Sequence, residues 1–184
     1  MTENDLYALV LATIDTGLKS FGLGLSVAVR QSQQPRVQGT PSGAAVLLSN
    51  VSSRRYGFLR REDQWFPDAD PPVMVHTETQ AMQVKLQCNA LSPIPSPPAL
   101  KPRYTAGDLV AYAAAVLQSD AGREQLQAGG VGIERITDIR QPYFKDERDQ
   151  FEASPSFDFT LDFNWSLSVT SPIIDATELR IVRV

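Results

Sequence analysis

A thirteen-residue alternation near the end of the chain constrains the fold more than any other feature of the sequence. From Phe157 to Val169, apolar side chains occupy every odd position and polar side chains every even position. A period of two is that of a β-strand with one buried and one solvated face. Because strands usually have about five or six residues, this strand is expected to belong to a large sheet or to reach beyond its own domain.

A second alternation, from Val73 to Ala90, predicts another long strand, and a helix is expected on each side of it. The first helix has apolar residues at three- and four-residue spacing between Leu6 and Phe21. The second begins at a Thr105 cap and is expected to break near Ser119 before it ends ahead of Gly129-Gly130. The order of helix, strands, helix and long hairpin predicts an α+β fold, with a mainly antiparallel, twisted sheet flanked by two helices.

A single domain is expected to span residues 1–184. Segments that are polar or rich in Pro and Gly interrupt the periodic stretches, and one of them holds five of the 13 prolines. Such segments favour extended loops or hairpins. The predicted loops are residues 31–43, 57–72 and 92–103, and residues 171–184 are predicted to form a C-terminal strand or arm.

A basic cluster with aromatic residues between its arginines runs from Arg54 to Arg61. Residues 44–53 and 58–62 are expected to pair as a hairpin around Tyr56-Gly57, which would put the cluster at the hairpin tip. Basic residues alternating with aromatics can hold a nucleic-acid backbone, but Arg and Tyr are also enriched at protein interfaces. The candidate subunit or partner interface comprises Arg54, Arg55, Tyr56, Phe58, Arg60 and Arg61.

The charge of the chain argues against a nucleic-acid binder that relies on its overall charge. The net charge of −4 lies entirely in residues 93–184, because residues 1–92 carry equal numbers of acidic and basic side chains. Proteins that bind nucleic acid without sequence preference are usually basic. The acidic N-terminus has no apolar leader, and no stretch approaches the roughly 18 apolar residues of a membrane span, so we expect no membrane partner.

The inventory of reactive side chains is too small for the usual catalytic arrangements. The single histidine, His76, sits in the second alternating segment, where a sheet-face or interface role is favoured over catalysis. The single cysteine, Cys88, lies on the apolar side of that segment, which indicates an inert buried thiol. One His and one Cys cannot form a zinc site. We therefore predict no enzymatic activity, no catalytic residue, no metal site and no cofactor.

Taken in chain order, these pieces resemble the neck or tail-terminator proteins of tailed bacteriophages. The resemblance covers nearly the whole chain and rests on order and character. Its parts are a first helix ending at Phe21-Gly22, the short strand and loop of Val29-Arg30-Gln31 and Gln34-Pro35, the long strand Glu78–Ala90, the helix Leu109–Leu126 closed by Gly129-Gly130-Val131, and the final strands Phe151-Glu152, Phe157–Phe163 and Ile173–Val184.

The resemblance implies a structural virion protein, assembled in the host cytoplasm, that forms a homo-oligomeric ring of commonly six copies at the phage neck. Such a ring caps the tail tube and meets the head-completion or connector proteins, with the sheath as a further candidate partner. DNA passes through its lumen without sequence-specific binding. Candidate lumen acids are Glu152, Asp158 and Asp162, and further candidate interface residues are Ile173, Ile174, Leu179 and Ile181.

Two alternatives to the ring stay open at this point. The first is a small non-catalytic binding module that contacts nucleic acid or an acidic protein through the hairpin from Arg54 to Arg61. Its affinity for DNA would fall steeply with added salt. The second is a hydrolase with an unrecognised site, which the thin inventory of acids, bases and nucleophiles disfavours.

Overall fold

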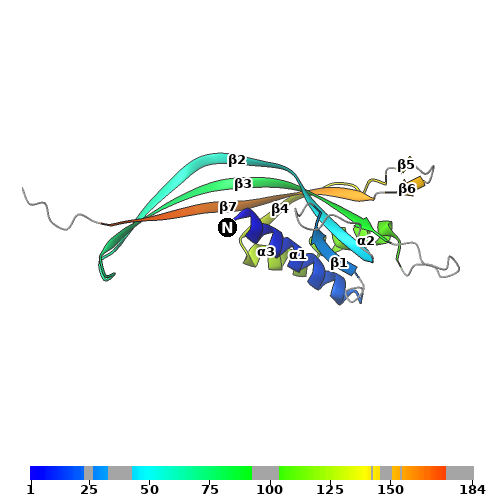
Figure 1. The fold of residues 1–184 in the computed structure, drawn as a ribbon, viewed down its shortest axis with the longest axis horizontal. Helices are drawn as coiled ribbons and strands as arrows, with labels where there is room; N and C mark the ends of the chain where they lie inside the picture. The colour runs from blue at the N-terminus through cyan, green and yellow to red at the C-terminus, as the bar shows by residue number, and fades with distance from the viewer. Residues whose placement is uncertain are drawn as a thin grey trace, which may run out of the picture.

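Three helices pack on one face of a five-stranded sheet, and three of the strands continue well beyond the helices (Figure 1). The computed structural model describes residues 1–22, 27–32, 43–92, 104–141, 143–145, 151–153 and 155–172. The helices are α1 (Glu3–Ser20), α2 (Ala106–Gln118) and α3 (Asp120–Ala128). The strands are β1 (Val27–Gln31), β2 (Ala44–Phe66), β3 (Val73–Leu91), β4 (Val131–Ile136), β5 (Tyr143–Lys145), β6 (Phe151–Ala153) and β7 (Ser156–Pro172).

Short polar motifs fix where the helices begin and end. Thr2 and Thr105 each start a helix with a capping box, in which the threonine hydroxyl accepts from the third helical amide and the aspartate there accepts from the cap amide. Hydrogen bonding to the cap lowers the pKa of Asp108. At the other end of α1, Gly22 adopts a φ of 75°. This is the left-handed conformation that ends many helices.

The predicted break in the second helix is confirmed and separates α2 from α3. Ser119 has an extended backbone there, and its hydroxyl accepts from the Gly122 amide at 3.1 Å. A Cβ on Gly122 would lie 2.1 Å from the carbonyl oxygen of Val116, so the turn between the helices leaves no room for a side chain at this position. The tight turn lets both helices lie against α1 and the sheet.

The large sheet has the order β1-β2-β3-β7-β4. The β1–β2 pair is parallel, and the β2–β3, β3–β7 and β4–β7 pairs are antiparallel. The predicted α+β class with a mainly antiparallel sheet is therefore confirmed, and both long alternations form strands. β5 and β6 pair as a separate two-stranded sheet.

The hydrophobic core lies between the helices and one face of the sheet. Side chains directly opposite each other on paired strands share a face, so the partners Phe159 and Leu86 point together toward the helices. The first half of the alternation is buried as predicted, from Phe157 to Phe163. Cys88 is buried in the same core. Burial raises the pKa of its thiol, as expected for an inert cysteine.

The predicted hairpin at Tyr56-Gly57 is wrong, and the predicted loop over residues 57–72 is confined to residues 67–72. β2 continues through this region as one strand to Phe66 and turns into β3 only over residues 67–72. A bulge absorbs Gly57, whose φ of 72° keeps the chain in the sheet instead of reversing it. The predicted loops over 31–43 and 92–103, and the predicted segment 171–184, lie mostly outside the described residues.

Candidate assembly interface

Three strands extend past the helices and form a projection that we call the arm (Figure 1). The arm consists of Tyr56–Phe66 of β2, Val73–Ala81 of β3 and Asn164–Pro172 of β7. β1 pairs with β2 only over Ala44–Leu48, and β4 pairs with β7 only as far as Phe163. The rest of the described molecule, which includes the helices, is called the body. The sheet therefore has five strands in the body and three in the arm.

The arm has no core of its own among the described side chains. None of them is buried, although the period of two continues along β7 as far as Val169. A sheet with an apolar face normally needs a covering layer, and exposed apolar patches are typical of interaction surfaces. The large apolar side chains exposed on the arm are Tyr56, Phe58, Leu59, Trp65, Phe66, Leu167 and Val169. Most of these were not predicted as interface residues, because alternation alone does not reveal where the covering helices end.

The predicted arginine cluster does not form one patch. Arg54 lies opposite Gln83, on the face that points away from the helices, which we call the polar face. Arg55 lies opposite the core residue Met82, on the face that continues the helix-packed side, which we call the helix-side face. The same alternation puts Arg60 on the polar face and Arg61 on the helix-side face. A continuous strand thus divides the four arginines between two surfaces.

Three of these arginines already have partners within the arm or at its base. Arg61 forms an ion pair with Glu78 at 2.9 Å, and Arg60 forms one with Glu62 at 3.5 Å. The Arg55 guanidinium lies 5.6 Å from the centroid of the Trp165 ring, which is within the range of a cation–π contact. The contacts of Arg61 and Arg55 join different strands, whereas that of Arg60 lies within β2. All three contacts compete with binding of these arginines to an external phosphate backbone.

Phe58 is the most exposed large apolar side chain of the described residues, at 99%. It occupies the bulge in which residues 57–59 of β2 oppose the single residue Gln80 of β3. The Gln80 side-chain amide donates to the carbonyl of Tyr56 at 2.5 Å and to that of Gly57 at 3.4 Å. Gln80 therefore braces the bulge, which holds the aromatic ring of Phe58 in solvent.

His76 links all three strands on the helix-side face of the arm. Its Nδ1 lies 2.7 Å from the carboxylate of Asp63, and its Nε2 lies 2.9 Å from the hydroxyl of Ser171. This is the order of a serine–histidine–aspartate relay. In such a relay the orienting carboxylate is buried, whereas the side chain of Asp63 is 63% exposed on an open sheet. We therefore interpret the three side chains as a cross-strand polar link.

Asp158, predicted as a lumen acid, is instead buried within a charge cluster at the body end of β7. It is 6% exposed, and its carboxylate lies 2.9 Å from both Lys85 Nζ and Arg140 Nη2. Burial by itself would raise the pKa of Asp158. Hydrogen bonds from Lys85 and Gln87 and the charge of Arg140 outweigh that effect and lower the pKa. This carboxylate stabilises the sheet instead of presenting charge to solvent.

Asp162, a second predicted lumen acid, lies on the polar face and is half-buried. Its carboxylate accepts from the Tyr56 hydroxyl at 3.3 Å and from the Gln83 amide at 3.2 Å. Burial and the nearby Asp162 charge raise the pKa of Tyr56, so the phenol stays protonated as the donor. The side chain of the third predicted acid, Glu152, lies outside the described residues, as do Ile173, Ile174, Leu179 and Ile181.

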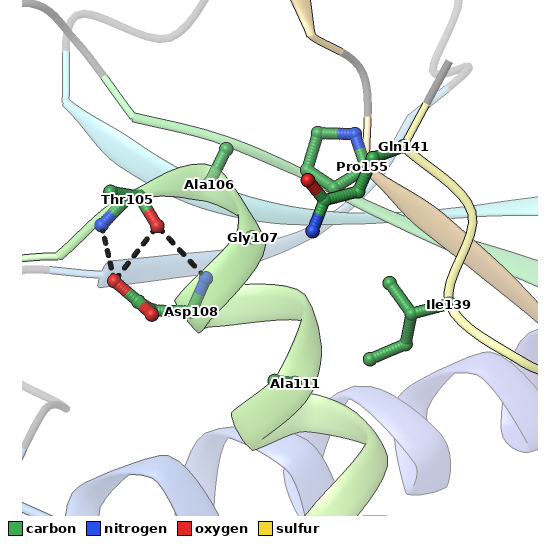
Figure 2. A pocket seen from close by; sticks show the side chains of 8 residues that line it. All are labelled: Thr105, Ala106, Gly107, Asp108, Ala111, Ile139, Gln141 and Pro155. Carbon is green, nitrogen blue, oxygen red and sulfur yellow. Dashed lines mark hydrogen bonds between the residues drawn. The ribbon is translucent and has the colours of Figure 1, made fainter.

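A hollow of about 510 Å³ lies at the start of α2, away from the arm. Figure 2 shows the lining side chains, among which Asp108 is the single ionisable group. Its carboxylate is held by the amide and hydroxyl of Thr105 in the capping box. The remaining lining residues are Ala106, Gly107, Ala111, Ile139, Gln141 and Pro155. The one hydroxyl beside a carboxylate in this lining is that of Thr105, and both groups are engaged in the capping box at the start of α2.

Two further kinds of site were sought across the described part of the chain. No group of three or more His, Cys, Asp or Glu side chains is placed there to hold a metal ion. None of the helices α1, α2 and α3 combines the length and the hydropathy that a membrane-spanning helix requires.

The fold has a counterpart among solved structures. The structure is similar to the sheath/tube terminator of an extracellular contractile injection system, PVC, solved by cryo-EM in the extended state, with a TM-score of 0.50 and 12% sequence identity. The match covers 100% of this chain and 64% of that one, so the chain spans less than two thirds of the terminator's length. At this identity the likeness establishes the shared fold.

The sequence establishes the family. The family model of the E217 gateway protein gp29 matches residues 5–173, and the chain belongs to this family of phage proteins. No curated protein matches the chain. The resemblance to phage tail-terminator proteins that was drawn from the sequence is thereby confirmed.

Proposed function

We propose that the chain is a non-enzymatic virion protein that forms a ring, hexameric by analogy with tail terminators, at the phage neck. The ring ends the tail tube, joins it to the head connector and lets DNA pass through its lumen. The family match supports a phage structural role, and the sheath/tube terminator shares the fold. The expected partners are further copies of the chain, the tail tube, the sheath and the head-completion proteins.

The observation that carries this proposal is the uncovered arm. Its three long strands expose apolar side chains and have no helix layer. They gain little from folding as a free subunit, because their apolar surface stays in water. Burial of this apolar surface by other chains would stabilise an assembly. A ring needs two different contact surfaces on each subunit, and the arm offers two different edges and two different faces.

The polar face suits a passage for DNA. Across the arm most side chains of this face are uncharged, and its two charged residues, Arg60 and Glu62, form an ion pair with each other. Hydroxyl groups on this face hydrogen-bond across β3 and β7: Thr77 to Ser168 at 3.0 Å and Thr79 to Ser166 at 3.4 Å. A neutral wall neither binds phosphates tightly nor repels them. The acidic wall expected from the sequence is reduced here, because Asp158 is buried and paired.

The alternative of a small binding module acting through Arg54–Arg61 has weaker support. The four arginines are divided between two faces, and three of them have partners in the chain. Fluorescence anisotropy with labelled duplex DNA at low and near-physiological salt, about 50 and 200 mM, tests this alternative. Tight binding that weakens by a factor of about 10³ or more over that range, as for a protein with six or more phosphate contacts, would favour it.

The proposed function is tested by cryo-EM of phage particles that carry this chain. We expect a ring of this fold between the connector and the tail tube. A matched lysate in which the chain is deleted should contain heads and tails that fail to join, and expression of the chain in trans should restore joined particles. Joined particles in the deletion lysate, or particles that lack the chain, would contradict the proposal.

A further inference from the structure

Both edges of the arm are open along its whole length. In the body, β1 pairs with the outer edge of β2 and β4 pairs with the outer edge of β7. Beyond Leu48 and Phe163 neither edge has a partner strand among the described residues. Edges of this length expose rows of amides and carbonyls that can pair with another chain.

The open backbone groups of β7 can be identified from its hydrogen bonds. Ser156 and Arg140 exchange two backbone bonds of 2.8 Å, and the Asp158 carbonyl accepts from the Thr137 amide at 2.8 Å, both on the side away from β3. The β3–β7 register has no shift, so each later even residue of β7 points its amide and carbonyl the same way. Within the arm these residues are Asn164, Ser166, Ser168 and Thr170.

The open backbone groups of β2 follow from the same reasoning. β3 is antiparallel to both neighbours, so the residues of β3 that bond to β7 alternate with those that bond to β2. The odd residues of β3, such as Thr77 and Thr79, therefore bond to β2, and their partners are Glu62 and Arg60. The odd residues of β2 point outward instead: Arg61, Asp63 and Trp65.

The two edges differ in how strongly they discourage pairing. From Asn164 to Ser171 the β7 edge has no charged residue, no proline and no register shift. From Arg54 to Asp63 the β2 edge carries four arginines and two acids, and the bulge at Phe58 interrupts it. Charges and bulges are the usual protection of an edge strand. The unprotected edge is therefore that of β7, and two β2 edges would repel each other.

We propose that the open edge of β7 in one copy pairs with the open edge of β2 in a second copy. This inference rests on the proposed ring and specifies its subunit contact. β2 and β7 are both antiparallel to β3 and so run in the same direction, which makes the contact between similarly oriented copies parallel. It joins unlike edges, and such a contact repeats around a ring until it closes.

The pairing also has a consequence for the two faces of the arm. The helices occupy one face of the sheet in the body (Figure 1), so the sheet closes most tightly with the helices outside. The polar face then surrounds the axis. The helix-side face of the arm, with Leu167 and Val169, stays on the outside, where it is available to the tail proteins.

Engineered disulfides test the pairing. Ser168→Cys and Glu62→Cys occupy the same row of the polar face, on opposite sides of β3. Two strand spacings separate them by about 9–10 Å, beyond the roughly 7 Å Cα separation that a disulfide tolerates. A bond between them must therefore join two copies. The native Cys88 is buried in the core and does not compete.

The double variant is oxidised in the assembled fraction, whether purified rings or particles, and run on a non-reducing gel. Arg60→Cys and Gln64→Cys, each combined with Ser168→Cys, cover the neighbouring registers. One of the three double variants should give a ladder of covalent multimers on the gel. The largest multimer in that ladder gives the number of copies in the ring. The single Ser168→Cys and Glu62→Cys variants are the controls and should give no ladder.

A backbone substitution gives an independent readout. Ser168→Pro removes an outward amide without breaking the bonds to β3, so the subunit should keep its melting temperature within a few degrees and lose its ring. Ser168→Ala, which removes the hydroxyl alone, should keep both the fold and the ring. Proline is tolerated in edge strands when its nitrogen faces outward.

The outcomes separate this inference from the proposed function. A ladder in one double variant, together with ring loss in Ser168→Pro, supports the pairing. Dimers from Ser168→Cys alone would show a β7–β7 contact and overturn it. Intact rings with no ladder in any register would overturn the pairing and leave the ring standing. A chain that neither self-associates nor enters particles would overturn the proposed function, and the pairing with it.

Discussion

The body and the arm share the strands β2, β3 and β7, yet side chains on the same face of these strands are buried in the body and exposed in the arm. In the body, Phe157, Phe159 and Leu161 of β7 are at most 1% exposed beneath the helices. A few residues further along the same face, Leu167 is 45% exposed and Val169 53% exposed. The strand pattern is the same in both regions, and the difference is the covering layer. An alternating strand identifies a face that is to be covered, but not the chain that covers it.

A charge placed on this face should have its largest effect in the body. Phe163→Asp puts a carboxylate at a position where the native side chain is only 6% exposed. An unpaired buried charge costs several kcal/mol against a total stability of roughly 5–15 kcal/mol, so we expect no cooperative thermal transition by circular dichroism. Leu167→Asp, on the same face of the arm, should fold with nearly the wild-type melting temperature and fail to assemble. Normal folding of Phe163→Asp would break the comparison.

Removing a carboxylate should have the next largest effect, again in the body. Asp158→Asn should lower the free energy of unfolding at pH 7 by about 1–3 kcal/mol, because Lys85 and Arg140 lose their partner. The folded pKa of Asp158 lies below its unfolded value. Its contribution is therefore present above about pH 4 and is lost as the pH falls through the folded pKa. Urea titrations from neutral to acidic pH measure both effects.

Asp63 in the arm provides a matched control for Asp158 in the body. Asp63→Asn removes an exposed acid that touches His76. Because exposed ion pairs contribute little, the free energy of unfolding should stay within about 0.5 kcal/mol of wild type. The same urea titrations measure it. Equal losses from Asp63→Asn and Asp158→Asn would mean that the arm is stabilised as strongly as the body.

Two glycines with positive φ should separate local from global stability. An alanine at Gly57 or Gly22 meets no atom within 4 Å. The cost is therefore that of the left-handed backbone alone, about 1–2 kcal/mol. In the arm, Gly57→Ala should speed amide hydrogen exchange in β2 and β3 while the body stays protected. In the body, Gly22→Ala should lower the melting temperature instead. Uniform exchange changes in Gly57→Ala would argue for one cooperative unit.

The smallest effect is expected at the most exposed aromatic residue, Phe58, whose side chain is 99% exposed. Surface substitutions of this kind usually change stability little, so Phe58→Ser should leave the free energy of unfolding within about 0.5 kcal/mol of wild type. Differential scanning calorimetry of the purified chain measures this. A loss above about 1 kcal/mol would show that the aromatic side chain of Phe58 supports the bulge. The structure assigns that role to Gln80.

Local patterns predicted much of the fold. The two alternations predicted β3 and β7, and the Thr105 cap predicted the start of the second helix, because these signals depend on neighbours in the sequence. The path of β2 could not be predicted in the same way. Gly57 between aromatic residues is typical of a turn, and what keeps it in the strand is the side chain of Gln80, which is distant in sequence.

The candidate site was harder to predict than the fold. At the tip of a hairpin, the four arginines would have formed one patch. In the continuous strand β2 they are divided between the two faces of the sheet. The sequence pattern favoured a solvated Asp158 because every even position from Ser156 to Thr170 is polar. Its burial depends on Arg140, which lies in a segment outside the strand. Leu167 and Val169 follow the core pattern of β7, so their exposure depends on where the helices stop.

The bulges of β2 have a geometric consequence for the arm as a whole. β2 has 23 residues and β3 has 19, and the surplus within their paired region lies at Val51 and within residues 57–59. A ribbon with one longer margin must bow, as Figure 1 shows. After each bulge the residues of β2 pair regularly with β3 again. Deleting the extra residues would therefore straighten the arm, and every remaining side chain would stay on its present face of the sheet. Curvature and surface chemistry are thus separate variables, and the direction of the arm can change while both of its faces stay the same.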